Sequence, residues 1–154
     1  DKFPASKVTQ ASFIIMILAV IGVMIFLPQN GQGGSFIGFF ASFMLLFAAT
    51  GIGNASTFAQ APRIFSALHR HHAKVFGLSE AEADNNAAKE SAAVVGFMGA
   101  VGAYGGFFIP KSFGTSIDLT GSAMMALICF ILFYCCCIAI NWWFYARKNA
   151  EVKC

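Results

Sequence analysis

The sequence predicts an all-α membrane protein with four transmembrane helices. Charged residues make up 11% of the chain and hydrophobic residues 58%, whereas a soluble domain carries about 25% charged residues. Charge is absent between Lys7 and Arg63, between Glu90 and Lys111, and between Asp118 and Arg147. Because a membrane-spanning helix needs about 20 apolar residues, each stretch can cross a bilayer and the first can cross twice.

The first stretch divides at Pro28 to Gly34, a polar segment rich in turn residues whose backbone could not be satisfied in lipid. The resulting spans are placed at about Val8 to Leu27, Ser35 to Ala61, Ser91 to Pro110 and Ser122 to Ala146. The chain starts at Asp1 without a methionine, and we expect it to be a piece of a longer protein.

Local signals mark where the helices begin and end. Pro28, Pro62 and Pro110 each stand at the end of a span, where a missing backbone N–H does least harm. Between the second and third spans, Ser79 and Glu82 have the spacing of a capping box. We expect a helix to begin there and to run without a break into the third span.

The basic residues predict the orientation, because the cytoplasmic flanks of membrane helices are enriched in Lys and Arg. One side of the membrane receives Lys2, Lys7, Arg63, Arg70, Lys74, Lys89, Arg147, Lys148 and Lys153. Only Lys111 falls on the other side. We therefore expect a multi-pass protein of the cell (inner) membrane with both ends in the cytoplasm. The net charge of +3 reflects this bias and not a nucleic-acid site.

Metal, redox and catalytic sites are weakly indicated. The cluster His69, His71 and His72 has no carboxylate or thiol within a turn and is typical of a solvated basic flank. The fourth span contains Cys129, Cys135, Cys136 and Cys137. Consecutive helical residues point about 100° apart, so buried thiols acting as small apolar side chains are favoured over a metal site. We expect no cofactor and no enzymatic activity, because no nucleophile, base and orienting group can be placed together.

The second span has a polar middle, from Thr50 to Gln60. Ser56 and Thr57 can each bond to a carbonyl of their own helix and have no further role. An amide in lipid needs partners, so Asn54 is expected to face other helices or a watery path.

The third span carries a stripe of glycines, at Gly96, Gly99, Gly102, Gly105 and Gly106. Each costs a helix about 1 kcal/mol relative to alanine, so a span that keeps them uses the missing side chains for close helix approach or for a backbone-lined path. A step of three residues turns by about 300°, so the stripe drifts around half of the helix. This favours a helix in the middle of a bundle, with simple helix packing as the alternative.

The run from Gly96 to Pro110 closely resembles the second nitrate signature of the nitrate/nitrite porter family of the major facilitator superfamily. Gly51 to Phe58 is similar to the tenth transmembrane helix of that family, and the Trp-rich last span also looks like it. The resemblance covers nearly the whole chain. Asp1 to Phe3 resembles the tail of the superfamily's cytoplasmic loop motif after helix eight, and the pattern departs at Pro4.

The resemblance implies that the spans are helices nine to twelve of a twelve-helix transporter, which moves nitrate and nitrite by alternating access. On this interpretation Gly99, Gly102, Gly105, Gly106 and Asn54 line the substrate path. The family holds its anion mainly with one arginine from each half, and neither arginine is in this chain. The implied partners are nitrate, nitrite, the lipid bilayer and the N-terminal helices of the same transporter, without nucleic acid.

Two alternatives stay open at this point. One is a major facilitator transporter of another small anion. The other is a four-helix membrane anchor subunit that docks a soluble enzyme or carries haem, which predicts histidines within the spans or a dedicated docking segment.

Overall fold

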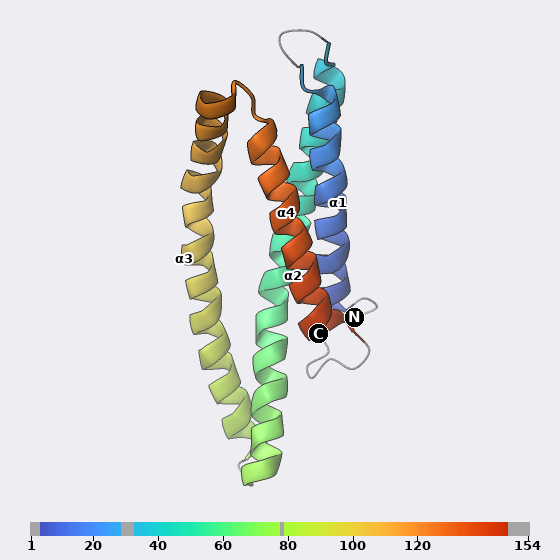
Figure 1. Ribbon diagram of the computed structural model, residues 1–154. Helices are drawn as coiled ribbons and strands as arrows, with labels where there is room; N and C mark the ends of the chain where they lie inside the picture. The colour runs from blue at the N-terminus through green and yellow to red at the C-terminus, as the bar shows by residue number, and fades with distance from the viewer. Residues whose placement is uncertain (1–3, 29–32, 78, 148–154) are drawn as a thin grey trace.

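The structure, a computed structural model, describes residues 4–28, 33–77 and 79–147. Its helices are α1 (Ala5–Phe26), α2 (Phe36–Phe76), α3 (Glu80–Thr120) and α4 (Met124–Asn141), and α4 ends in the π-helical turn η1 (Trp142–Ala146). They run alternately up and down, with α3 standing beside a group formed by α1, α2 and α4 (Figure 1). All four are long and apolar enough to cross a membrane, which confirms the predicted fold class.

The helices α2 and α3 are longer than the predicted spans, because they continue through Pro62 and Pro110. The prediction that these prolines stand at helix ends was wrong. An interior proline removes one hydrogen bond and costs about 3 kcal/mol, which favourable contacts further along a helix can offset. The helices end at Gly77 and Gly121, whose φ values of 69° and 70° form left-handed caps. The limits of the membrane-embedded parts stay a prediction, as does the loop motif at residues 1–3, which lies outside the described residues.

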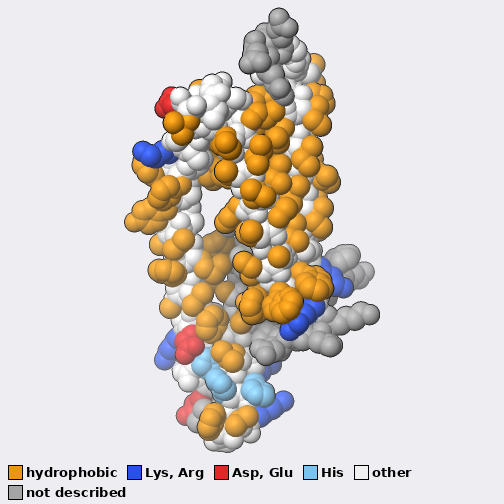
Figure 2. Space-filling view, in the orientation of Figure 1, with side chains coloured by type: hydrophobic (Ala, Val, Ile, Leu, Met, Phe, Trp, Pro, Cys, Tyr) orange, Lys and Arg blue, Asp and Glu red, His pale blue; other side chains and the backbone are white. Residues whose placement is uncertain are grey.

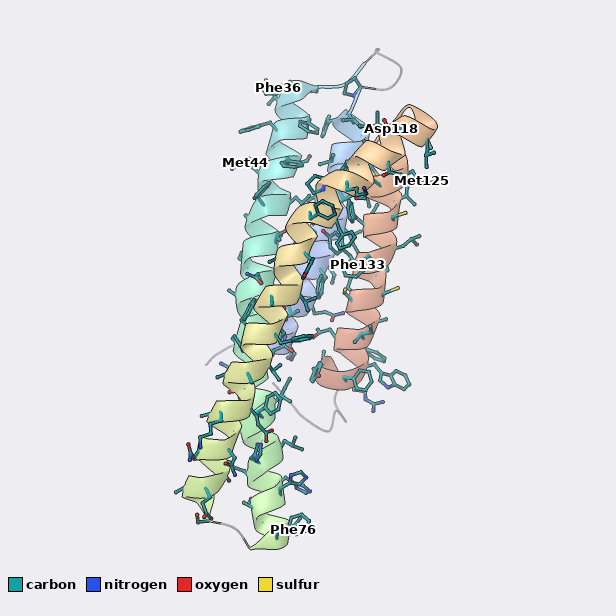
Figure 3. The ribbon with its side chains drawn as sticks, turned by 90° about the vertical axis from the view of Figure 1, so that its left-hand side faces the viewer. Phe36, Met44, Phe76, Asp118, Met125 and Phe133 are labelled. Atoms are coloured by element: carbon teal, nitrogen blue, oxygen red, sulfur yellow. The ribbon has the colours of Figure 1, made fainter. Side chains whose placement is uncertain are left out.

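A long hairpin of α2 and α3 projects past the ends of α1 and α4 (Figure 1). Its α3 arm starts at the predicted capping box, in which Ser79 Oγ accepts from the Glu82 N–H at 3.2 Å and Glu82 Oε2 accepts from the Ser79 N–H at 3.4 Å. Figure 3 shows Phe76 at this end of the bundle and Phe36 and Asp118 at the other. The helix runs on from the box into the third span, as expected.

The core lies between α1 and α4, where Val20, Val23 and Leu127 are buried. Partly buried side chains from all four helices pack against them, namely Met24, Leu27, Phe39, Leu46, Phe113, Met124, Ile131 and Tyr134. The helices α1 and α2 approach each other closely at glycines: a Cβ atom at Gly22 would lie 2.6 Å from Ser42 Oγ. Small residues thus serve helix packing in this pair.

The described thiols do not lie in the core. Cys129, Cys135 and Cys136 are exposed and Cys137 is half-buried. The expectation of buried thiols was therefore wrong for most of them: within the described helices they lie on the outer surface of α4, which also carries the exposed side chains of Ile128, Leu132 and Phe133.

The helix α3 is fastened near its two ends. In the hairpin, Arg70 of α2 donates from Nε to Asp84 Oδ1 at 3.0 Å and from Nη2 to Asp84 Oδ2 at 3.3 Å, and His69 Nε2 lies 2.9 Å from Glu90 Oε2. At the far end, the buried Ser116 hydroxyl donates to the carbonyl of Ser122 at 2.7 Å, just before α4.

The hydrogen bonds from Arg70 hold the pKa of the Asp84 carboxyl below its usual value of 3.8. A lowered carboxyl pKa stabilises the folded hairpin above that value, and the contribution is lost as the pH falls through the folded pKa. We expect Asp84→Asn to speed amide hydrogen exchange in the hairpin modestly at pH 7, because the pair is exposed and screened by salt. The exchange rates of wild type and variant should become equal at a pH low enough to protonate Asp84 in both the folded and the unfolded protein. The control is Asp118→Asn, at the other end of the bundle, which should leave the exchange rates in the hairpin unchanged. Equal exchange rates at pH 7 would contradict the stabilising role.

Candidate functional site

The glycine stripe has open space where side chains would begin. A Cβ atom at Gly99, Gly102, Gly105 or Gly106 would meet no atom of the other described helices within 4 Å. No residue in the most apolar 18-residue window of α3 is buried. Among the described residues, glycines therefore serve close helix packing between α1 and α2, and the glycines of this stripe do not.

A cavity of about 580 Å³ lies between the four helices, and its lining on α3 follows the stripe in sequence. Its wall on α2 includes Phe43, Phe47 and Thr50, and its wall on α3 includes Ile109 and Phe113. The lining is largely aromatic and aliphatic, and the Thr50 hydroxyl is bonded to a carbonyl of its own helix, Leu46 O, at 2.7 Å. The residues that line the cavity thus identify the side of α2 that faces α3 and the side of α3 that faces α2.

Part of the stripe shares the cavity-facing side of α3. At about 100° per residue, Gly102 and Gly105 lie about 20° and 40° from Ile109 around the helix, one to two turns closer to the hairpin. Gly106 and Gly99 lie about 60° and 80° from it, at the margin of the same face.

Asn54 has the matching position on α2. It lies one turn beyond Thr50 and about 40° from it around the helix. Its side chain is exposed, and no described residue forms a hydrogen bond with its amide. His69 of α2 and Glu90 of α3 lie side by side. Asn54 precedes His69 by as many residues as Gly105 follows Glu90, so Asn54 and Gly105 lie at the same level of these antiparallel helices. The structure thus places the predicted residues on facing sides of α2 and α3, while their path-lining role stays a prediction.

Other polar residues of the second span bond within the bundle. Thr57 Oγ1 donates to Gly53 O at 2.8 Å, in agreement with the interpretation that it satisfies its own helix. Ser56 Oγ also lies within hydrogen-bond distance of Gly53 O, at 2.9 Å, as expected. In addition, it lies 2.8 Å from Thr9 Oγ1 of α1, to which Gln60 Nε2 donates at 2.5 Å. Sequence reasoning did not identify this network.

A second buried amide fastens α4 to α1. Asn141 Nδ2 donates to Gln10 Oε1 at 2.7 Å and to Ser6 O at 3.0 Å. The available signal for both networks was the recurrence of Ser6, Thr9 and Ser12 at every third position, which puts polar groups along one side of α1.

Comparison with known proteins identifies the relatives of this chain. No family model matches it. It is 41% identical over 154 residues, 99% of the chain, to the nitrate/nitrite transporter NarU of Escherichia coli strain K12, and 43% identical over 151 residues, 98% of the chain, to NarU of Salmonella typhimurium. Over its whole length the chain is therefore similar to the C-terminal part of nitrate/nitrite porters. It is also 29% identical over 154 residues to the probable nitrate/nitrite antiporter NarK2 of Thermus thermophilus.

The chain spans about a third of the length of these relatives, 33% and 32% for the NarU proteins and 30% for NarK2. Its four helices correspond to the C-terminal third of major facilitator transporters, helices nine to twelve. It is therefore part of a multi-pass membrane protein. Figure 2 shows side chains of Lys, Arg, Asp, Glu and His gathered mainly at the hairpin end, with hydrophobic side chains over the middle.

Proposed function

We propose that the full-length protein transports nitrate and nitrite across the cell inner membrane by alternating access, and that these four helices form part of the wall of the anion path. The observation that carries this proposal is the similarity of the whole chain, at 41% and 43% identity, to proteins named nitrate/nitrite transporters. The position of Asn54 opposite Gly102 and Gly105 supports it. The protein has no enzymatic role in this proposal.

In this proposal, these four helices supply part of the wall of the anion path, and other helices of the transporter supply the positive charge that binds the anion. Backbone amides inside a continuous helix are already hydrogen-bonded, so Gly102 and Gly105 contribute space and not affinity. The Asn54 amide has two N–H donors and can donate to a nitrate oxygen. All described lysines and arginines lie outside the expected spans. Since a buried anion without a counter-charge is strongly disfavoured, arginines from the other two thirds of the transporter supply the charge.

The orientation is also part of the proposal. The first residues of α1, the α2–α3 connection and the end of η1 lie at the same side of the bundle (Figure 1). Arg63, Arg70, Lys74 and Lys89 belong to the hairpin end or its approach, and Lys111 to the other side. By the excess of basic residues on cytoplasmic flanks, both ends of the chain and the hairpin lie in the cytoplasm.

The purified full-length protein in liposomes tests the function. Vesicles loaded with nitrite should take up labelled nitrate, and unlabelled nitrate should compete. Exchange of another small anion together with failure of nitrate to compete would overturn the substrate assignment. Absence of exchange for every small anion, with folded protein in the vesicles, would overturn transport itself.

A further inference from the structure

The helix α2 has one face that packs against α1 and another that faces α3. Gly53, Ser56 and Gln60 are buried against α1. Asn54 lies about 100° around the helix from Gly53, on the side that faces α3. The direction of Asn54 is therefore set by how the buried face is seated on α1.

Hydrogen bonds hold the buried face of α2 against α1. Gln60 Nε2 donates to Thr9 Oγ1 at 2.5 Å, and Ser56 Oγ lies 2.8 Å from the same oxygen. The Thr9 hydroxyl donates to Ala5 O at 3.0 Å, which fixes Thr9 on its own helix. The side chains are nearly inaccessible, with exposed fractions of 5% for Gln60, 3% for Thr9 and 8% for Ser56.

Around these hydrogen bonds the interface between α1 and α2 is made mostly of small buried residues: Ala49 and Gly53 on α2 and Ser12 on α1, whose Cβ lies 3.3 Å from the position of a Cβ at Gly53. The larger buried side chain nearby is Met16 of α1, whose sulfur accepts a hydrogen bond from Thr50 Oγ1 at 3.3 Å. Small side chains pack closely without ridges that lock the rotation, whereas hydrogen bonds in an apolar surrounding are directional and costly to leave unmade.

We infer that Gln60, Thr9 and Ser56 form a clamp that fixes the rotation of α2 and so aims Asn54 at the anion path. The three are positioning residues, since they act through Asn54 and do not face the path. The inference rests on the proposed nitrate transport and extends it to α1, a helix with none of the predicted path residues.

Isosteric variants of the full-length transporter test the clamp. Thr9→Val and Gln60→Met keep the shapes of the side chains and both remove the bond between residues 9 and 60, and Thr9→Val also removes the contacts with Ser56 and Ala5 O. Each should raise the apparent KM for nitrate in liposomes at least about fivefold, the factor that corresponds to one hydrogen bond of about 1 kcal/mol. Thr9→Ser keeps the hydroxyl and should retain the wild-type KM. If Gln60→Met does not fold, the Thr9 pair still decides the question.

The matched control is Asn141→Leu, which removes a buried amide that fastens α4 to α1 and touches neither α2 nor the path. It should lower the melting temperature of the purified protein with an unchanged KM. If Thr9→Val and Gln60→Met lower the melting temperature and also keep the wild-type KM, the clamp is only structural and the inference fails. Lack of nitrate exchange by the wild-type protein is a separate outcome, which overturns the proposed function and the inference with it.

Discussion

Replacing Gly102 by leucine in the full-length transporter is expected to reduce nitrate–nitrite exchange at least about tenfold while the protein still folds and inserts, a change of about 1.4 kcal/mol in the limiting barrier. A Cβ atom at this position would meet no atom of α1, α2 or α4 within 4 Å, so the leucine side chain starts in open space. It would occupy the space between α2 and α3. The rate of labelled nitrate uptake, normalised to folded protein, measures the effect.

Two further variants make the result specific. Gly105→Leu, on the same face, should behave as Gly102→Leu. Gly114→Leu is the control, because Gly114 also has open space around it but lies about 140° from Ile109 around the helix, on the outer side. An unchanged rate and apparent affinity in Gly102→Leu and Gly105→Leu would contradict the path-lining role.

Asn54→Leu should weaken the apparent affinity for nitrate about tenfold or more, because a hydrogen bond to a charged group contributes about 1.5–3 kcal/mol. The amide has no partner among the described residues, so its loss leaves no buried group of these helices unpaired. Folding should therefore be unaffected. Competition by unlabelled nitrate against nitrite exchange provides the measurement.

The control for this variant is Thr57→Val, one turn away on α2. Its hydroxyl is bonded to Gly53 O of the same helix at 2.8 Å and is available neither to an anion nor to another helix. Thr57→Val should keep the wild-type affinity. If Asn54→Leu does so too, Asn54 does not contact the anion.

The helices could be predicted from the sequence because membrane insertion depends on the composition of a single segment. Their lengths could not, since the continuation of α2 beyond Pro62 accompanies pairing with α3, as in Arg70 with Asp84, and the continuation of α3 beyond Pro110 accompanies the bond from Ser116 to the carbonyl of Ser122. A proline is a local signal, whereas that pairing brings together residues from different helices.

In the candidate site, too, some residues could be identified from the sequence and others only from the structure. Asn54 could be singled out from the sequence because an amide in an apolar span is unusual in itself. Thr9 could not, because a threonine normally bonds to its own helix, and only the packing of α1 on α2 places Gln60 within reach of it. Single unusual residues and local pairs such as Ser79 with Glu82 were visible in the sequence, whereas pairs between different helices required the structure.

The two attachments of α3 differ in how they respond to ionic strength. The pair Arg70–Asp84 is exposed, so dissolved salt screens it. The hydroxyl of Ser116, which is 5% exposed, bonds to Ser122 O and to the N–H of Ala126 out of reach of ions. We therefore expect concentrated salt to weaken the attachment of α3 at the hairpin and to leave the attachment at its other end intact, so that the two ends of this helix differ in their sensitivity to solution conditions.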